Sequence, residues 1–157
     1  MVEWISDVVS NLTNPSVFVD WKPFGVVTGI NSKSGVFNDE PLYNLLTDIY
    51  QEKGGEMYRR FVVSCVDANT GAYITFNETS PDIPMSSVSS SSIPGVFPDR
   101  IWPDYDGGVV CMDGGAVWNI NVASAVQRCR EVVDNDEDII LDVIDCFPKA
   151  VLGPWED

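Results

Sequence analysis

One aspartate in this sequence has neighbours that suit acid–base chemistry. Asp113 follows the apolar run 109–112 and precedes Gly114 and Gly115. A short, wholly apolar run is typical of a strand buried in a sheet, and in open α/β sheets ligands bind at the carboxyl ends of the strands. Glycine has no Cβ, so the backbone there can turn sharply and approach another segment closely. We therefore expect Asp113 at the tip of a strand, where it could accept a proton from a nucleophilic hydroxyl.

The pKa of this carboxylate decides how well it would serve as a base. An unperturbed aspartate has a pKa of about 4, which makes it a weak base for serine, and partial burial would raise that pKa. The alternative is that Asp-Gly-Gly is a plain turn. A second copy, Asp106-Gly107-Gly108, precedes the apolar run and is therefore at the wrong end of the strand, so we expect a loop there.

Composition excludes several kinds of chemistry. The chain has no histidine, which excludes Ser-His-Asp and Cys-His mechanisms and imidazole metal sites within it. The formal net charge of −15 argues against binding to nucleic acid or docking to anionic membranes, because both need clustered Lys and Arg. The acidic run 134–138 resembles the start of a calcium loop, but Ile139 stands where such a loop needs glycine. We predict no metal and no cofactor.

The cysteines and the sequence start leave the compartment open. The four cysteines lack CxxC spacing and three lie in apolar runs, so we expect small core residues rather than disulfides. They are Cys65, Cys111, Cys129 and Cys146. Two tripeptides, at residues 11–13 and 77–79, match the glycosylation sequon, a pattern that also arises by chance. Residues 1–12 lack the basic start of a signal peptide, and no apolar run is long enough to span a bilayer. A cytoplasmic location is one option.

Hydrophobic periodicity and turn residues predict a single α/β domain. The chain is long enough to bury one core, and no boundary divides it. The expected elements are helices at 5–12, 38–53 and from Asn121, a hairpin of strands 59–66 and 72–76, a packed helix or turn at 86–92, and buried strands at 109–112 and 139–144. The order strand, helix, strand over 109–144 is a βαβ unit, which predicts a mainly parallel sheet in addition to the hairpin.

Four motifs in a fixed order resemble the patatin-like phospholipase family. They are the segment 35–42, the strand and turn at 66–71, the serine-rich tract 86–98 with its Ile-Pro-Gly-Val-Phe-Pro ending, and the segment 112–115 followed by Asn119-Ile120-Asn121. The resemblance covers roughly residues 15–145. The combined order is far more specific than any one motif.

This resemblance implies a three-layer α/β/α fold and a Ser-Asp dyad that hydrolyses lipid acyl esters, such as those of phospholipids or acylglycerols. Asp113 falls at the dyad aspartate of the family, and Gly114 and Gly115 complete its motif. Asn119 and Asn121 lie near the family's asparagine–proline step, but no proline follows here, which leaves their supporting role open. The resemblance implies no cofactor and no metal.

The chain departs from the family at the nucleophile. The family's serine lies in a G-x-S-x-G elbow, and its oxyanion hole lies in an earlier glycine-rich loop. No serine here has glycine at both −2 and +2, and the nearest imitations, Ser32 and Ser34, have the wrong spacing. We therefore expect residues 1–157 to be one partial patatin-like domain that lacks the nucleophile portion and is inactive alone.

Three alternatives stay open at this point. The chain could be a binding module for lipid or protein without catalysis, one chain of a split enzyme whose partner supplies the nucleophile, or the product of a truncated gene. A partial domain should expose an apolar patch, which we expect around residues 109–112 and 139–144.

Overall fold

The computed structural model describes residues 2–105 and 107–144. Within this part of the chain the structure is mixed α/β, with six α-helices and two antiparallel sheets. The helices are α1 (Val2–Ser10), α2 (Asn14–Val17), α3 (Val26–Ser32), α4 (Glu40–Glu52), α5 (Ile83–Ser89) and α6 (Val122–Arg130), with 3-10 turns η1 (Gly114–Ala116) and η2 (Asp136–Asp138). Over the same residues, no helix combines the length and the apolar character that a membrane span requires.

The strands form a small sheet and a larger one. β1 (Val19–Asp20) pairs with β2 (Phe37–Asn38), and the larger sheet contains β3 (Val62–Asp67), β4 (Tyr73–Asn77), β5 (Arg100–Trp102) and β6 (Val109–Asp113). The structure confirms the predicted helices near residues 5–12 and 38–53 and the helix that begins near Asn121. It also confirms the β3–β4 hairpin. The predicted strand at 109–112 is β6, one residue longer than expected.

The direction of the strands contradicts the expected parallel sheet. The larger sheet has the order β4-β3-β6-β5, and β6 runs antiparallel to both of its neighbours. In register, Cys65 of β3 faces Asp113, and Arg100 of β5 faces Cys111. An apolar run indicates that a strand is shielded, but it carries no information about the direction of the strands beside it. The prediction of a mainly parallel sheet was therefore wrong.

The second half of the expected βαβ unit is also wrong. Residues 139–144 have no regular secondary structure, and Ile140 and Ile144 are 90% and 94% exposed. A strand needs a neighbour to pair its backbone groups, and the described part of the chain pairs none with this segment. The expected apolar patch is present at 139–144, whereas Val109 and Cys111 are buried.

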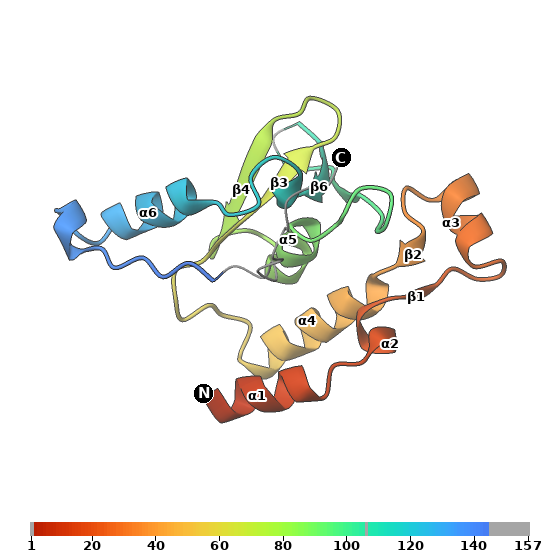
Figure 1. Cartoon of the computed structure of the whole chain (residues 1–157), viewed down its shortest axis with the longest axis horizontal. Coiled ribbons are helices and arrows are strands. Elements are labelled where there is room, and N and C mark those ends of the chain that lie inside the picture. The colour runs from red at the N-terminus through yellow and green to blue at the C-terminus, as the bar shows by residue number, and fades with distance from the viewer. Residues whose placement is uncertain (1, 106, 145–157) are drawn as a thin grey trace, which may run out of the picture.

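The core lies between the larger sheet and α5. It contains Cys65, Phe76, Trp102, Val109 and Cys111, all facing the same side of the sheet. Phe76 stacks on Trp102 with ring centroids 4.6 Å apart, and Trp102 is buried, which makes it a core residue. Figure 1 shows α5 between the sheet and α4, with α1 beyond α4.

The serine-rich tract forms the buried helix α5 rather than a linker. Ser86 and Ser89 are fully buried, and each hydroxyl donates to a backbone carbonyl one turn earlier, at 2.7 Å. Asp82 begins the helix, because its side chain accepts a hydrogen bond from the Met85 amide at 2.8 Å. Hydroxyls satisfied within their own helix can be buried at little cost, which explains how so polar a tract fills the core.

Two of the four cysteines form a disulfide, which corrects the expectation of small, unlinked core residues. Cys65 of β3 and Cys111 of β6 are joined, with their Cα atoms 5.4 Å apart. They are 46 positions apart in the sequence, and only the pairing of β3 with β6 brings them together. Cys129 is a free thiol, and Cys146 lies outside the described residues.

Candidate functional site

Asp113 is the last residue of β6, a central strand of the larger sheet. Its backbone N–H donates to the carbonyl of Ser92 at 2.8 Å, and it faces Cys65 across the β3–β6 ladder. The backbone of Asp113 is therefore held by the residues that follow α5 and by the neighbouring strand. The expected position at the carboxyl end of a central strand is confirmed.

The carboxylate of Asp113 has one anchored oxygen and one open oxygen. Oδ1 accepts a hydrogen bond from the Gly115 N–H at 2.7 Å, which caps the short turn η1. Oδ2 accepts no hydrogen bond from any residue that the structure describes, and the side chain is half-buried. A carboxylate that is oriented through one oxygen can accept a proton on the other from a donor that comes within hydrogen-bond reach.

The two glycines of the motif serve different purposes. A Cβ on Gly114 would lie 2.4 Å from the backbone oxygen of Ser64, so only glycine fits where this residue packs on β3. A Cβ on Gly115 would lie 3.1 Å from Oδ1 of Asp113, against the carboxylate itself. Close approach, as expected from the sequence, is what requires glycine at these positions.

The second Asp-Gly-Gly copy needs glycine for another reason. Gly107 and Gly108 have φ angles of 80° and 97°, in the left-handed region that favours glycine, and both have room for a Cβ. They lie in the turn before β6, as predicted, while Asp106 lies outside the described residues. Identical tripeptides thus carry out different structural tasks at the two ends of one strand.

Of the two asparagines suggested as supporting residues, only one lies beside the motif. Oδ1 of Asn119 would lie 3.3 Å from a Cβ placed on Gly115, the residue whose N–H donates to Asp113. Asn119 is exposed and forms no hydrogen bond with the described residues, so its amide is free to contact a ligand. Asn121 is the N-cap of α6, where its Oδ1 accepts from the Ser124 amide at 3.1 Å. That contact makes Asn121 a structural residue.

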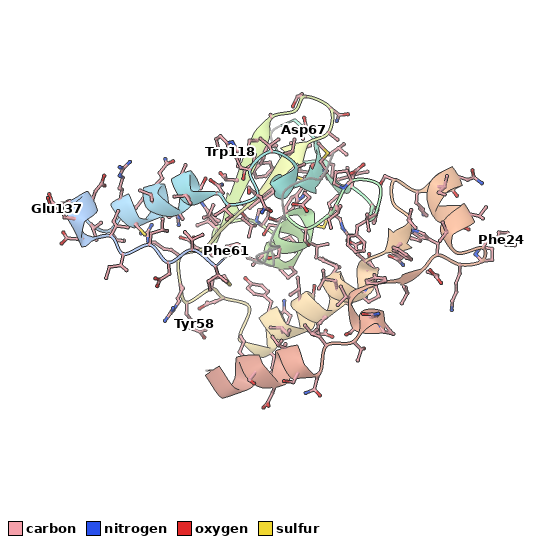
Figure 2. The ribbon with its side chains drawn as sticks, viewed as in Figure 1. Phe24, Tyr58, Phe61, Asp67, Trp118 and Glu137 are labelled. Carbon is pink, nitrogen blue, oxygen red and sulfur yellow. A yellow bond between two sulfur atoms is a disulfide. The ribbon has the colours of Figure 1, made fainter. Side chains whose placement is uncertain are left out.

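Two hydroxyl groups that the sequence did not identify, on Ser64 and Tyr73, lie beside the Asp-Gly-Gly motif. The Ser64 and Tyr73 hydroxyls are 2.6 Å apart, and Ser64 is the residue on which Gly114 packs. The ring of Tyr73 contacts Trp118, with centroids 4.9 Å apart, so the turn after β6 rests on β3 and β4 (Figure 2). Strand alternation places Ser64 and Tyr73 on one face, but no sequence signal marks either as a neighbour of Gly114.

The segments that carry the family resemblance meet in space. Phe37 donates its backbone N–H to Val96 at 2.9 Å, which joins the segment 35–42 to the end of the serine-rich tract. Ala68 donates to Val110 at 2.7 Å, which joins the hairpin turn to β6. With the bond from Asp113 to Ser92, these contacts link the motifs in series: 66–71 and 86–98 both bond to β6, and 35–42 bonds to 86–98.

The nearest imitations of a nucleophile have structural roles. Ser32 lies in α3 and donates its hydroxyl to the Thr28 carbonyl at 3.0 Å. The Ser34 hydroxyl accepts from the Asp99 amide at 2.8 Å. Both serines are bonded within the fold as loop and helix residues, which agrees with their failed spacing.

A buried ion pair lies outside the Asp-Gly-Gly motif, between Asp39 and Arg100. Asp39, 2% exposed, accepts from Arg100 at 2.5 Å, and the Arg100 side chain is 11% exposed. Burial raises the pKa of Asp39, although the guanidinium beside it acts in the opposite direction. The pair ties the start of α4 to β5 and is closed to solvent, so we assign it to structure rather than to chemistry.

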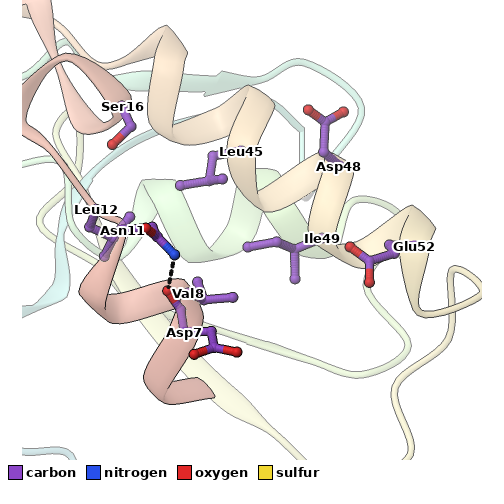
Figure 3. A pocket seen from close by; sticks show the side chains of 9 residues that line it. All are labelled: Asp7, Val8, Asn11, Leu12, Ser16, Leu45, Asp48, Ile49 and Glu52. Carbon is purple, nitrogen blue, oxygen red and sulfur yellow. Dashed lines mark hydrogen bonds between the residues drawn. The ribbon is translucent and has the colours of Figure 1, made fainter. Parts of the chain in front are cut away.

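The three hollows we describe on the chain do not include the Asp-Gly-Gly motif. The largest, about 380 Å³, lies between α1 and α4, where Val8, Leu12, Leu45 and Ile49 form an apolar floor with acidic residues around it (Figure 3). Hollows of about 280 and 190 Å³ are lined by residues near β5 and near the end of α4. None of these three hollows, in the part of the chain that the structure describes, is lined by Asp113, Gly114 or Gly115.

Comparisons with models of known families, with curated proteins and with solved structures found no match to this chain. The assignment of the site therefore depends on the sequence motifs and on the geometry described above.

Proposed function

We propose that this chain supplies the aspartate of a Ser-Asp dyad in a patatin-like lipid acyl hydrolase. The observation that carries the proposal is the carboxylate of Asp113, which is anchored through Oδ1 and open at Oδ2, at the carboxyl end of a central strand. The hydrogen bonds that join β6 to the motifs 66–71 and 86–98, and the bond that joins 86–98 to the segment 35–42, support the same assignment. The finer three-layer patatin-like fold belongs to this proposal as well.

The nucleophile in this proposal comes from outside residues 1–157. The hydroxyl attacks the ester carbonyl of a phospholipid or acylglycerol while Asp113 accepts its proton. Asp113 passes that proton to the leaving oxygen, so the alcohol departs and an acyl-enzyme forms. The deprotonated Asp113 then takes a proton from water as the water attacks the acyl-enzyme, and it returns this proton to the nucleophile oxygen as the fatty acid leaves. The exposed segment 139–144, with Ile140 and Ile144 uncovered, is what a domain would show when part of its sheet is missing.

A serine-directed label tests where the nucleophile lies. The 157-residue chain should show no covalent labelling by a fluorophosphonate and no ester hydrolysis, because none of its serines lies in an elbow. Labelling of any serine in this chain would contradict the proposal. The same label on the complete enzyme, purified from the cells that produce this chain, should mark a serine outside these residues.

A substitution in that complete enzyme tests the role of Asp113. Asp113→Asn should lower kcat about 10²- to 10⁴-fold, the usual contribution of a general base. Asp104→Asn is the matched control, because it removes the same charge from an exposed aspartate outside the motif. Equal activity of the Asp113→Asn and Asp104→Asn enzymes, both folded by circular dichroism, would refute the assignment.

A further inference from the structure

Two features outside the proposed dyad point to the same compartment. The first is the disulfide between Cys65 and Cys111, which forms in the core of the larger sheet. Disulfides form and persist in oxidising environments, and they are rare in the reducing cytosol. The second is the tripeptide Asn77-Glu78-Thr79, which has the sequence of an N-glycosylation acceptor with no proline in the middle.

The geometry of Asn77 suits an acceptor. Thr79 donates both its backbone N–H and its hydroxyl to Oδ1 of Asn77, at 2.9 and 2.7 Å. Nδ2 of Asn77, the atom to which a sugar would be attached, donates no hydrogen bond to any described residue. A glycan on Nδ2 would therefore replace no contact of the fold and would leave the Asn77–Thr79 turn intact.

Asn77 lies half-buried at the rim of the larger sheet, two residues before an exposed threonine. Asn77 is the last residue of β4, which is the edge strand of the larger sheet, and Thr79 after it is exposed. The turn is closed by Ser80, whose N–H donates to the Asn77 carbonyl at 3.0 Å. A glycan at this end would also shield an edge strand, whose unpaired backbone groups otherwise invite association.

The other acceptor tripeptide is less well suited. Asn11 ends the turn after α1, and its Nδ2 already donates to the carbonyl of Asp7 at 2.8 Å (Figure 3). Its threonine, Thr13, bonds forward to Ser16 rather than back to the asparagine. The two sequons thus differ in whether the acceptor nitrogen is free.

We propose that Asn77 carries an N-linked glycan and that the chain folds in an oxidising secretory compartment. In the transfer, a bond forms between Nδ2 of Asn77 and the anomeric carbon of a sugar, and the bond from that carbon to the pyrophosphate of a lipid-linked donor breaks. Nδ2 loses one proton, and the lipid pyrophosphate is the leaving group. This inference is independent of the role of Asp113, since neither the acceptor nor the disulfide takes part in the proposed hydrolysis.

The first test translates the full chain, behind a cleavable signal sequence, in the presence of endoplasmic-reticulum microsomes. A glycan should be present on the wild-type chain, absent from Asn77→Gln and Thr79→Ala, and retained by Thr79→Ser, which keeps the acceptor pattern. Asn11→Gln should leave the Asn77 glycan unchanged. A wild-type chain that stays unmodified, or a glycan that persists in Asn77→Gln at an unchanged mass, would overturn the proposal.

The second test uses the protein from the cells that produce it. Peptide mapping after enzymatic removal of N-glycans should find Asp in place of Asn at position 77, and non-reducing digestion should recover the peptides of Cys65 and Cys111 as one cross-linked species. Unconverted Asn77 on a chain whose Cys65 and Cys111 are both reduced would refute glycosylation and compartment together.

Discussion

The disulfide between Cys65 and Cys111 should make the stability of this chain depend strongly on redox conditions. The two residues are 46 positions apart, and cross-linking a loop of that length removes conformational entropy from the unfolded chain. The chain-entropy relation gives a stabilisation of about 4 kcal/mol at 25 °C for such a loop. We therefore expect the oxidised protein to be more stable than the reduced protein by about this amount.

Urea unfolding measures the difference directly. Urea m-values for small proteins are about 1–3 kcal/mol per M, so a loss of about 4 kcal/mol should lower the midpoint by about 2 M when reductant is added. The double variant C65A/C111A should unfold near the midpoint of the reduced wild type and should not respond to reductant. Cys129→Ala is the matched control, because this thiol is free, and it should retain the full response to reductant.

Equal midpoints with and without reductant would refute this reasoning. Titration of thiols on the unfolded, non-reduced chain makes the outcome unambiguous, because Cys65 and Cys111 should both be protected from alkylation. If both are alkylated, they are small core residues, as the sequence alone suggested, and the compartment inferred from the disulfide loses its support.

Three further predictions concern packing and charge. Gly114→Ala should destabilise the fold by about 1–3 kcal/mol through overpacking. Gly115→Ala should lower the stability less and should disturb mainly the carboxylate of Asp113 beside it. The urea midpoints of the two variants test this difference. Asp39→Asn should destabilise by about 3 kcal/mol in the same assay, because it removes the buried partner of Arg100 and leaves only the exposed Glu40, 3.5 Å away. Hydrogen bonds from the Thr70 hydroxyl and the Val110 amide lower the pKa of Asp67 in the folded protein. The ionised Asp67 therefore stabilises the fold above its unfolded pKa of about 4, and this contribution is lost as the pH falls through the folded pKa. Between pH 7 and about pH 3 the wild type should lose more stability than Asp67→Asn, and equal losses would contradict this.

Local patterns in the sequence predicted local structure well. The helix α4 follows from apolar spacing, an N-terminal Asn-Asp-Glu-Pro and a closing glycine pair, all of which lie within the element or within three residues of its ends. The hairpin likewise follows from a turn sequence between two alternating runs. Even Asp113 was correctly predicted at a strand end, because an apolar run followed by two glycines is a local signal.

What could not be predicted depends on contacts between distant residues. The neighbours of β6 run antiparallel to it, and no property of its five residues records that direction. The disulfide joins two strands whose pairing is itself a tertiary result. The sequence suggested a close approach at Gly114, but its partner, Ser64 on β3, is a long-range contact that no local signal identifies.

These long-range contacts also bear on how the proposed base would work. The contacts that hold Asp113 come from Ser92, from Cys65 on the facing strand and from Gly115, and Gly114 fixes the turn by packing on Ser64. All of these residues belong to the described part of this chain, so the carboxylate is oriented before any nucleophile arrives. Groups held in advance need little reorganisation when charge develops in a reaction. A segment that completes the site would then have to bring the hydroxyl, the oxyanion donors and a pocket for the substrate, but it would not have to orient the base.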